Sequence, residues 1–489
     1  MQIKMRLYLF LFLITYYHSY AQDTSYKNLS PVIVSANKLK EKRSQSPIAI
    51  SILSSKLIEE TKAQRIDALL NKVSGVYMPT IGGEQHMMSI RQPISLKGLY
   101  LYLEDGMPIR TSGLFSNNAL IELNTSNINT VEIIKGPASA LYGAEAIGGV
   151  INFLTQPTPT KNSFNITTQI NNTGFKKIDL SGGVPRLKGG WGINASLINQ
   201  KNGATEYSDY NKKAISIKRH FFLNKKLSGY QTLNYIDYYT QMTGSLDSIK
   251  FFQKNFSSQQ TFTFRKITAL RLRQNLQYDW NTNASTTINL MYRNNIMDQN
   301  PTYSIASTSN PTKFKGQINS NQFDAYVLDM QHHWNFKNIK SKLLLGGYWD
   351  FTPQNLIAHY IDIFKDTAIG KYTSYNYPTK DSLVTSYETT LNNKAIYVNY
   401  IFDLNKFVRI NGSIRYDDFK YIFNNLLPSG TPSANNHFTN WTPKLGINFN
   451  KNHHGVFANY SEGFVPPQIT EIYNAIRVPF LLPQKFKKF

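Results

Sequence analysis

The chain has 489 residues, with 53 Lys and Arg against 30 Asp and Glu and a formal net charge of +23. This length exceeds what one ordinary core needs, and it predicts several domains or one large barrel with a second unit. The mean hydropathy of −0.36 excludes a protein built of many transmembrane helices, because each span needs about 20 consecutive apolar residues. The absence of Cys excludes disulfides and thiol chemistry, and 31 Tyr and 29 Phe are too many for a disordered chain.

The amino terminus has the three parts of a secretory signal. Lys4 and Arg6 precede a short apolar run that ends at Thr15, and Ala21 closes a small-residue cleavage site. The apolar run is about half the length that a membrane anchor needs. We therefore predict a signal peptide over residues 1–21 and an exported mature chain, which is either soluble or a β-barrel.

Residues 46–156 have mixed α and β character. Strand-like runs such as PIAISIL, LYLYLED and VEIIKG alternate with segments of helical spacing. The clearest helical segment is 63–73, where apolar residues recur at i, i+3, i+4 and i+7. Pro157 and Pro159 then interrupt regular structure. The pattern predicts a small α/β domain that ends near residue 156.

From residue 161 to 489, apolar and polar residues alternate with period two, in about a dozen segments of roughly ten residues. This length and alternation are typical of outer-membrane strands, although a soluble β-sandwich or β-helix also alternates. Unequal connections and aromatic strand ends favour a barrel with aromatic girdles. The aromatic residues in question are Tyr278, Trp280, Tyr292, Tyr348, Trp349, Tyr397, Tyr400 and Phe402.

Residues 131–155 predict a compact strand–turn–strand unit. A strand precedes the Gly136-Pro137 turn, a helical turn reaches Gly143, and Gly148-Gly149 opens a second strand. The spacing of Gly143 and Gly148 also suggests a phosphate-binding loop. That reading fails, because Gly149-Val150 stands where Lys and Ser or Thr are required.

This segment resembles the plug signature of TonB-dependent outer-membrane receptors, and the stretch from Ile90 to Pro108 resembles an earlier part of the same plug. In that stretch a basic residue and Gly precede a strand ending in Asp-Gly-x-Pro, with Lys97 where the family usually has Arg. Lys keeps the charge and loses the bidentate fork. The plug-motif residues are Arg91, Lys97, Gly98, Asp105, Gly106, Glu132, Gly136, Pro137, Tyr142, Gly143, Gly148 and Gly149.

The resemblance implies a TonB box in the periplasmic leader, residues 22–45. Its residues would be Pro31, Val32, Ile33, Val34, Ser35 and Ala36. A β-branched, extended run can add as a strand to another protein's sheet, which is how an energy-transducing TonB protein would bind it. The alternative is that these residues form the first strand of the plug.

Other candidate sites have weaker support. His86, Met87 and Met88 follow Gly82-Gly83, where plug loops of the family face the external ligand, but the simpler interpretation is that they are solvated loop residues. Adjacent His pairs at 332–333 and 453–454 point to opposite faces of a strand and cannot jointly chelate a metal. No catalytic arrangement stands out. We predict no enzyme activity, no metal site and no cofactor.

The positive charge has two explanations. A basic lumen could attract an anionic ligand or lipopolysaccharide phosphates. Alternatively, Lys pairs such as 176–177, 212–213 and 225–226 could lie in turns and only solvate a surface. Nucleic-acid binding is not expected of an exported barrel.

The carboxyl end departs from the family. The stretch 459–473 resembles a mid-barrel strand and loop, after which full-length relatives continue, and plugged transporters have 22 strands. We therefore predict a mainly β fold, in which a small α/β plug domain (46–156) precedes an antiparallel transmembrane β-barrel (161–489) truncated in its C-terminal part. The alternative is a smaller barrel.

The predicted function is an outer-membrane receptor that binds a scarce external ligand, most simply a ferric siderophore or other iron complex. It would import this ligand by proton-motive-force energy, in contact with outer-membrane lipid and with TonB. Truncation would leave open whether this chain transports. The alternative function is an exported, non-transporting β-protein that binds a polyanion or a surface partner.

Overall fold

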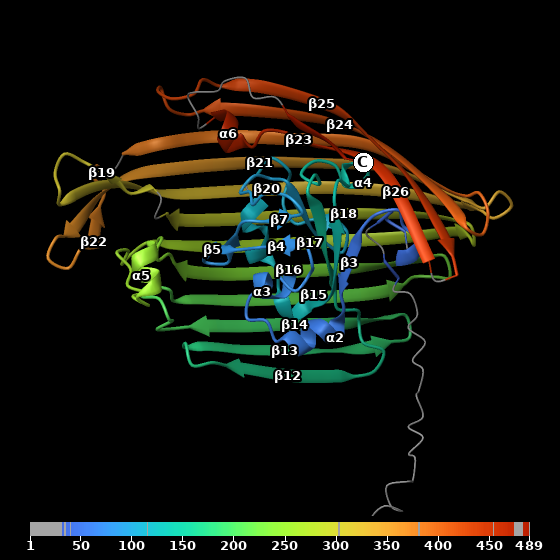
Figure 1. The fold of residues 1–489 in the computed structure, drawn as a ribbon, viewed down its shortest axis with the longest axis horizontal. Helices are drawn as coiled ribbons and strands as arrows, with labels where there is room; N and C mark the ends of the chain where they lie inside the picture. The colour runs from blue at the N-terminus through green and yellow to red at the C-terminus, as the bar shows by residue number, and fades with distance from the viewer. Residues whose placement is uncertain are drawn as a thin grey trace, which may run out of the picture.

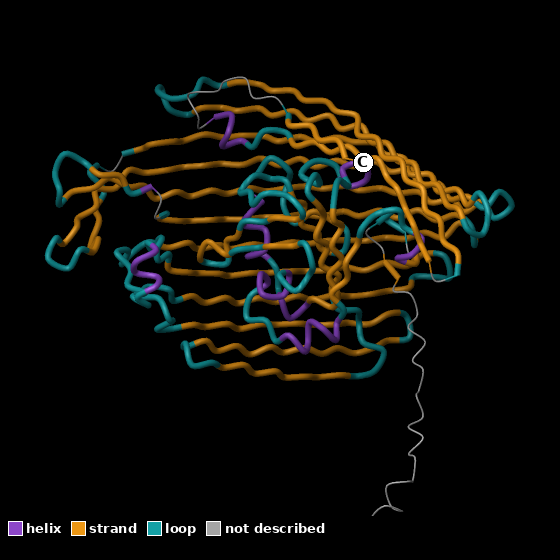
Figure 2. Tube along the Cα trace, in the orientation of Figure 1, coloured by secondary structure: helices purple, strands orange, loops and turns teal. Residues whose placement is uncertain are grey.

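The computed structural model describes residues 32–33, 36–39, 41–114, 116–301, 304–379, 382–452, 454–473 and 483–488. A small body, here called the plug and formed by residues 41–156, lies in the hollow of one large curved sheet (Figure 1). Tracing the chain by secondary structure shows helices only in the plug and in the connections of the large sheet (Figure 2). The predicted signal peptide and residues 22–31 of the predicted leader lie outside the described residues.

The plug is organised around a five-stranded sheet of order β3-β10-β11-β8-β9, in which β11 and β8 run parallel. These strands are β3 Ile50–Leu53, β8 Tyr100–Glu104, β9 Met107–Pro108, β10 Ile128–Lys135 and β11 Gly149–Thr155. The expected strand runs in PIAISIL, LYLYLED and VEIIKG are confirmed. Shorter pairs are β1 Val32–Ile33 with β2 Glu41–Lys42, β4 Val76–Tyr77 with β7 Ser89–Ile90, and β5 Thr80–Gly82 with β6 Gln85–His86.

Short helices cover the plug sheet and close its core. They are η1 Arg43–Gln45, α2 Ser55–Thr61, α3 Ile66–Leu70, η2 Ser116–Glu122, η3 Thr125–Asn127 and α4 Ser139–Tyr142. The helix expected over 63–73 is confirmed as the shorter α3, which buries Ile66, Leu69 and Leu70 against the sheet. Helix α2 is capped by the preceding residue, Ser54, whose hydroxyl accepts the Leu57 N–H at 3.3 Å.

The large sheet has sixteen strands, in which β19 and β22 lie off the main path from β12 to β27. No pairing joins β12 to β27 in the part of the chain that the structure describes, so the sheet is open there. Consecutive strands on the path pair antiparallel. The first strands are β12 Ser163–Ile170, β13 Phe175–Arg186, β14 Gly189–Gln200, β15 Tyr210–Phe222, β16 Leu227–Gln241, β17 Phe264–Asn281, β18 Ala284–Asn300, β19 Ala306–Ser307 and β20 Lys313–Phe336. The last are β21 Ser341–Asp366, β22 Lys371–Asn376, β23 Leu383–Asp403, β24 Val408–Asn425, β25 Ala434–Lys451, β26 His454–Val465 and β27 Gln484–Lys488.

The connections differ at the two ends of the sheet. At one end the strands are joined by short turns, such as 282–283 and 337–340. At the other end, long connections carry α5 Ser248–Phe252, α6 Ile469–Tyr473 and the small strands β19 and β22 (Figure 1). We call these the short-turn end and the long-loop end. No helix among the described residues is long and apolar enough to cross a membrane.

The strands of the large sheet differ from expectation in length and in their inner face. Strand β21 has 26 residues, well beyond the roughly ten expected of a strand that only spans the membrane. Along β16, buried Asn234, Ile236 and Tyr238 alternate with more exposed residues, because the concave face contacts the plug and is partly polar. Tyr348 and Tyr397, expected in an aromatic girdle, instead pack against the plug, which corrects that expectation for these two residues.

The expectation that Lys pairs lie in turns is also wrong for two of the three pairs. Lys176-Lys177 lies in β13 and Lys212-Lys213 lies in β15, whereas Lys225-Lys226 does lie in a turn. In each of these two lysine pairs, one of the two side chains faces the hollow of the sheet. Lys177 forms an ion pair with Asp179 at 2.8 Å, and Lys212 forms one with Glu84 of the plug at 2.8 Å. These inward lysines therefore have carboxylate partners and are not solvated surface charges.

Candidate functional site

The β10–α4–β11 unit has the local structure that its glycines predict. After β10, Gly136 has a φ of 137° and Pro137 starts the turn into α4. The Ala138 N–H donates to the Ala146 carbonyl at 2.8 Å, which closes the loop before β11. Gly149 opens β11 opposite Lys135, where a side chain would collide with the Ile134 carbonyl. The unit therefore needs small residues for backbone approach.

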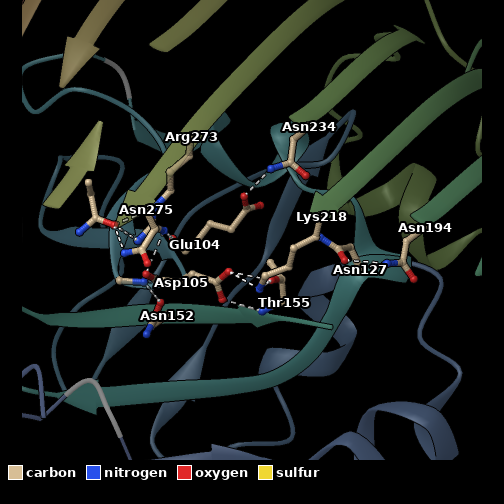
Figure 3. Close-up of polar contacts among 12 residues, drawn as sticks. Glu104, Asp105, Asn127, Asn152, Thr155, Asn194, Lys218, Asn234, Arg273 and Asn275 are labelled. Atoms are coloured by element: carbon tan, nitrogen blue, oxygen red, sulfur yellow. Dashed lines mark hydrogen bonds and ion pairs between the residues drawn. The ribbon is translucent and has the colours of Figure 1, made fainter. Parts of the chain in front are cut away.

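Asp105 fixes the turn between β8 and β9 to the end of β11. Asp105 and Gly106 both have positive φ, 47° and 80°. The Asp105 carboxylate accepts the Thr155 N–H at 2.8 Å and the Thr155 hydroxyl at 2.6 Å (Figure 3). The Gly106 N–H donates to Asn152 Oδ1 at 2.9 Å. The Asp-Gly turn therefore holds a mostly buried carboxylate in a fixed position.

Barrel-wall cations converge on this turn. Lys218 of β15 lies with its Nζ 3.3 Å from Asp105 Oδ2 and donates to the Thr155 hydroxyl at 2.9 Å (Figure 3). Arg273 of β17 donates to the main-chain carbonyls of Glu104 and Asp105 at 3.3 and 3.1 Å. Burial acts to raise the pKa of Asp105, but Lys218 and Arg273 outweigh it and hold that pKa below its usual value.

Glu104 has a matching set of partners one residue earlier. Its carboxylate accepts from Arg271 at 2.9 Å and from Asn234 at 2.7 Å. Beside it, Glu122 of η2 accepts from Arg110 at 2.5 Å and lies 3.7 Å from Arg271. Plug carboxylates thus face barrel guanidinium groups across the interface, where charge-assisted hydrogen bonds are strong.

A second buried contact ties the plug to β18 and β21. Arg293 Nη2 lies 2.6 Å from Asp350 Oδ2, and both side chains are almost fully buried. The Thr111 hydroxyl of the plug contacts both partners, at 2.7 Å from Arg293 and 3.1 Å from Asp350. Arg293 also donates to the Pro108 carbonyl at 3.0 Å. The plug is therefore bound to β18 and β21 as well as to β15 and β17.

The β5–β6 hairpin points to the long-loop end, beside the starts of β15 and β17. Glu84 binds Lys212, and Gln85 accepts from Arg265 at 3.2 Å. His86 and Met88 are buried inside the plug and are not solvated loop residues, which corrects that alternative. His86 Nε2 lies 2.7 Å from the Tyr102 hydroxyl, and burial lowers the pKa of His86 to about 3. A ligand-binding role for His86, Met87 and Met88 stays a prediction.

The predicted TonB box is only partly described. Pro31, Val34 and Ser35 lie outside the described residues, whereas Val32–Ile33 forms β1 and pairs antiparallel with Glu41–Lys42. Ile33 and Ala36 are buried in a cluster that includes Leu344 and Tyr397 of the wall.

Lys38 fastens the same segment to the wall. Its ammonium lies 3.5 Å from Asp329 Oδ1 of β20, donates to the Tyr397 hydroxyl at 2.9 Å and lies over the Tyr397 and Tyr142 rings. Burial lowers the pKa of Lys38, although Asp329 opposes this shift. The described leader residues Ile33, Ala36 and Lys38 therefore pack against both the plug and the wall.

The other predicted plug residues have mainly structural surroundings. Arg91 has a φ of 55° and an exposed side chain, and Lys97 is exposed, with its N–H donating to Ser95 Oγ at 2.9 Å. A side chain at Gly98 would lie 2.9 Å from Glu145 Oε1. Glu132 is buried within β10.

Glu145 was not singled out from the sequence. It is buried, accepts the Gly113 N–H at 2.9 Å, and burial raises its pKa to about 8. Its acidic character alone could not have revealed this, because its neighbours come from distant parts of the chain.

Together these contacts can hold a folded plug inside the sheet. Among the described residues, no group of three or more His, Cys, Asp or Glu could hold a metal ion. The polar partners pair with one another across the plug–wall interface instead of converging on an open space. The fold and this interface have the architecture of a plugged outer-membrane β-barrel, with the wall open between β12 and β27 among the described residues.

Two family models match the chain. The TonB-dependent Receptor Plug Domain matches residues 42–150, and the TonB dependent receptor-like β-barrel matches residues 156–486. The chain therefore belongs to the TonB-dependent receptors and is an outer-membrane protein. The long-loop end is then extracellular and the short-turn end periplasmic.

Sequence relatives include the vitamin B12 transporter BtuB of Vibrio vulnificus, 28% identical over 187 residues, which are 36% of this chain and 30% of that protein. BtuB of Vibrio cholerae is 25% identical over 168 residues, 34% of this chain and 27% of that protein. The matched region therefore spans less than a third of these relatives.

Solved structures with the same fold include the unliganded ferric citrate transporter FecA, with a TM-score of 0.76, 15% identity, and coverage of 90% of this chain and 66% of that chain. The siderophore receptor PiuA of Acinetobacter baumannii has a TM-score of 0.71 and 16% identity, with 92% and 70% covered. Pyoverdine-bound FpvA of Pseudomonas aeruginosa has a TM-score of 0.74 and 15% identity, with 89% and 59% covered. At these identities the similarity establishes the fold alone.

Proposed function

We propose that this protein imports a scarce external ligand across the outer membrane, using energy delivered by TonB. The observation that carries the proposal is a plug fastened inside the barrel wall and preceded by a leader strand, β1, which pairs with Glu41–Lys42 at the periplasmic end. A ligand bound from outside would have to pass the plug, and a periplasmic partner would supply the work.

The proposed TonB contact is the extended segment Pro31 to Ala36. Its described strand, Val32–Ile33, has only the two-residue strand β2 as a pairing partner. Two residue pairs give little cooperative stability, so another sheet edge could replace β2 by strand addition. Binding to TonB would also require Ile33 and Ala36 to leave their buried positions.

We propose a ferric siderophore or another iron complex as the ligand. Such complexes are commonly anionic, and the net charge of +23 favours an anion. Lys212, which is paired with Glu84, and Arg265, which donates to Gln85, lie beside the β5–β6 hairpin on the extracellular side of the plug. The relatives named for vitamin B12 make cobalamin the first competing ligand to test.

The test is uptake by cells that express this chain and lack their own receptors. Labelled ferric citrate, a ferric catecholate, a ferric hydroxamate and cobalamin are supplied one at a time, with and without a protonophore. The proposal predicts accumulation of one iron complex that the protonophore abolishes, while surface binding persists. Binding without accumulation for every ligand would instead support a non-transporting exported protein. Accumulation of cobalamin alone would overturn the iron assignment.

A further inference from the structure

A basic cavity lies at the periplasmic end, between the base of the plug and strands β24 to β26. Its volume is about 820 Å³. Six cationic side chains line it, and among the residues that the structure describes Asp403 is the one carboxylate in the lining. The cationic residues are Lys42, Arg43, Arg91, Lys135, Lys406 and Arg409.

The fold holds the plug side of this cavity in place. The 3-10 helix η1, which carries Arg43, is tied to β25 by two amide side chains that donate to the Ser44 carbonyl: Asn448 at 3.1 Å and Asn450 at 2.7 Å. Arg91 is positioned by its N–H, which donates to the Gly75 carbonyl at 3.1 Å. Cations from two separate plug segments therefore project from anchored backbone.

One residue, Arg409, already binds the two carboxylates near the cavity, Asp403 and Glu41. Arg409 binds Asp403 through two nitrogens, at 2.5 and 2.9 Å, and its Nη1 lies 3.6 Å from Glu41. Within the described ranges, no ion pair reaches Lys42, Arg43 or Arg91. The cavity therefore has several cations and no remaining carboxylate to balance them.

The ammonium group of Lys135 lies close to two of these cations, Arg91 and Arg43. Its side chain is 9% exposed, and its ammonium donates to the Ser74 carbonyl at 2.6 Å. Burial lowers the pKa of Lys135, and the positive charges of Arg91 and Arg43 lower it further. A group whose pKa is lowered by two neighbouring guanidinium groups would be stabilised by an anion between them.

We propose that this periplasmic cavity binds a phosphate group, either of a soluble phosphorylated compound or of a phospholipid headgroup. Arginine forks and lysine ammonium groups suit the tetrahedral, multiply charged phosphate, and the volume suits a small organic ligand. This site is separate from the extracellular ligand, and its Lys42 belongs to β2, the strand that pairs with β1.

The experiment compares the full chain with R43Q/R91Q and with K225Q/K226Q. The control pair lies in an exposed periplasmic turn between β15 and β16, outside the cavity, and removes the same two charges. Pyrophosphate binding is measured by calorimetry in a neutral detergent. Retained phosphatidylglycerol is counted by native mass spectrometry after reconstitution in nanodiscs of phosphatidylglycerol and phosphatidylcholine. Circular dichroism checks that all three proteins keep their β content.

We expect one of the two phosphate probes to bind saturably to the full chain and to K225Q/K226Q, and at least tenfold more weakly to R43Q/R91Q. Pyrophosphate binding in detergent identifies a soluble phosphate compound, and binding seen only in nanodiscs identifies a lipid phosphate. Equal binding by all three proteins overturns the proposal, as does the absence of saturable binding for both probes. None of these outcomes bears on uptake across the plug.

Discussion

Replacing Asp105 by Asn tests whether charge pairing fastens the plug to the barrel wall. The substitution keeps the volume and one acceptor for Thr155, but it removes the negative charge 3.3 Å from Lys218. Both side chains of this pair are mostly buried, with 19% of Lys218 and 16% of Asp105 exposed. An uncompensated, largely buried ammonium and a weakened hydrogen bond should cost about 2 kcal/mol.

Unfolding of the plug can be measured because the chain has no Cys. A single Cys at the exposed position Glu59 carries an environment-sensitive label, and urea unfolding is followed by its fluorescence. With a urea slope of about 1.5 kcal/mol per molar, a loss of 2 kcal/mol lowers the midpoint by about 1.3 M. The control is Glu60→Gln, which removes an exposed i,i+4 pair with Lys56 and should shift stability by less than about 0.5 kcal/mol.

The stabilisation of the plug by Asp105 depends on pH in one direction. Since the pKa of Asp105 is held below its usual 3.8, the stabilisation is complete above that pH and disappears as pH falls through the lower folded-state pKa. The difference between Asp105→Asn and the parent should therefore shrink well below pH 3.8. A midpoint for Asp105→Asn that matches Glu60→Gln at pH 7 would refute the reasoning.

Two further substitutions probe the plug. Gly143→Ala should lower plug stability by about 2 kcal/mol, because φ is +84° and the new Cβ would lie 2.9 Å from Arg415 Nη2. The control is Gly347→Ala, whose new Cβ would have no atom within 4 Å and which should change stability by less than about 0.5 kcal/mol in the same urea assay. Glu145→Gln should remove a pH dependence: burial raises the pKa of Glu145 from 4.5 to about 8, so the parent plug loses stability as pH rises between those values. The Gln variant should be the more stable at pH 8.5 and close to the parent at pH 5, and equal midpoints at both pH values would contradict the assigned cause.

The order of elements in the plug was predictable because local chemistry determines it. Gly136 and Pro137 require particular backbone conformations, Gly148-Gly149 has no room for a side chain, and the strands on either side are apolar and β-branched. The alternation of the barrel strands was visible for the same reason, since period two follows from strand geometry. The length of β21 was not visible, because its extension beyond the membrane has no local signal.

The contacts of the plug–wall interface could not be predicted from one sequence. Asp105 meets Lys218 and Arg273 across more than 100 residues, and neither barrel residue departs from an ordinary alternating strand. Lys212 was expected in a turn, because a Lys pair suggests a solvated surface. It lies in β15 instead, where it faces a polar plug, and no local signal in the sequence shows that the inner face of the wall is polar. Tyr397 was expected in an aromatic girdle because it lies in an alternating strand. Its hydroxyl instead contacts Lys38 and Asp329 on the inner face of the wall.

The most direct test of the central claim is energised uptake by the variant Ile33→Pro, compared with Ile33→Val. Proline removes the N–H of β1 and resists strand addition, whereas valine keeps a β-branched, extended residue. Both variants are expressed in receptor-deficient cells, and binding and accumulation of the labelled iron complex are measured separately. The account predicts that Ile33→Pro binds the complex normally but accumulates less than about a tenth of the Ile33→Val level. Equal accumulation by the two variants would contradict it.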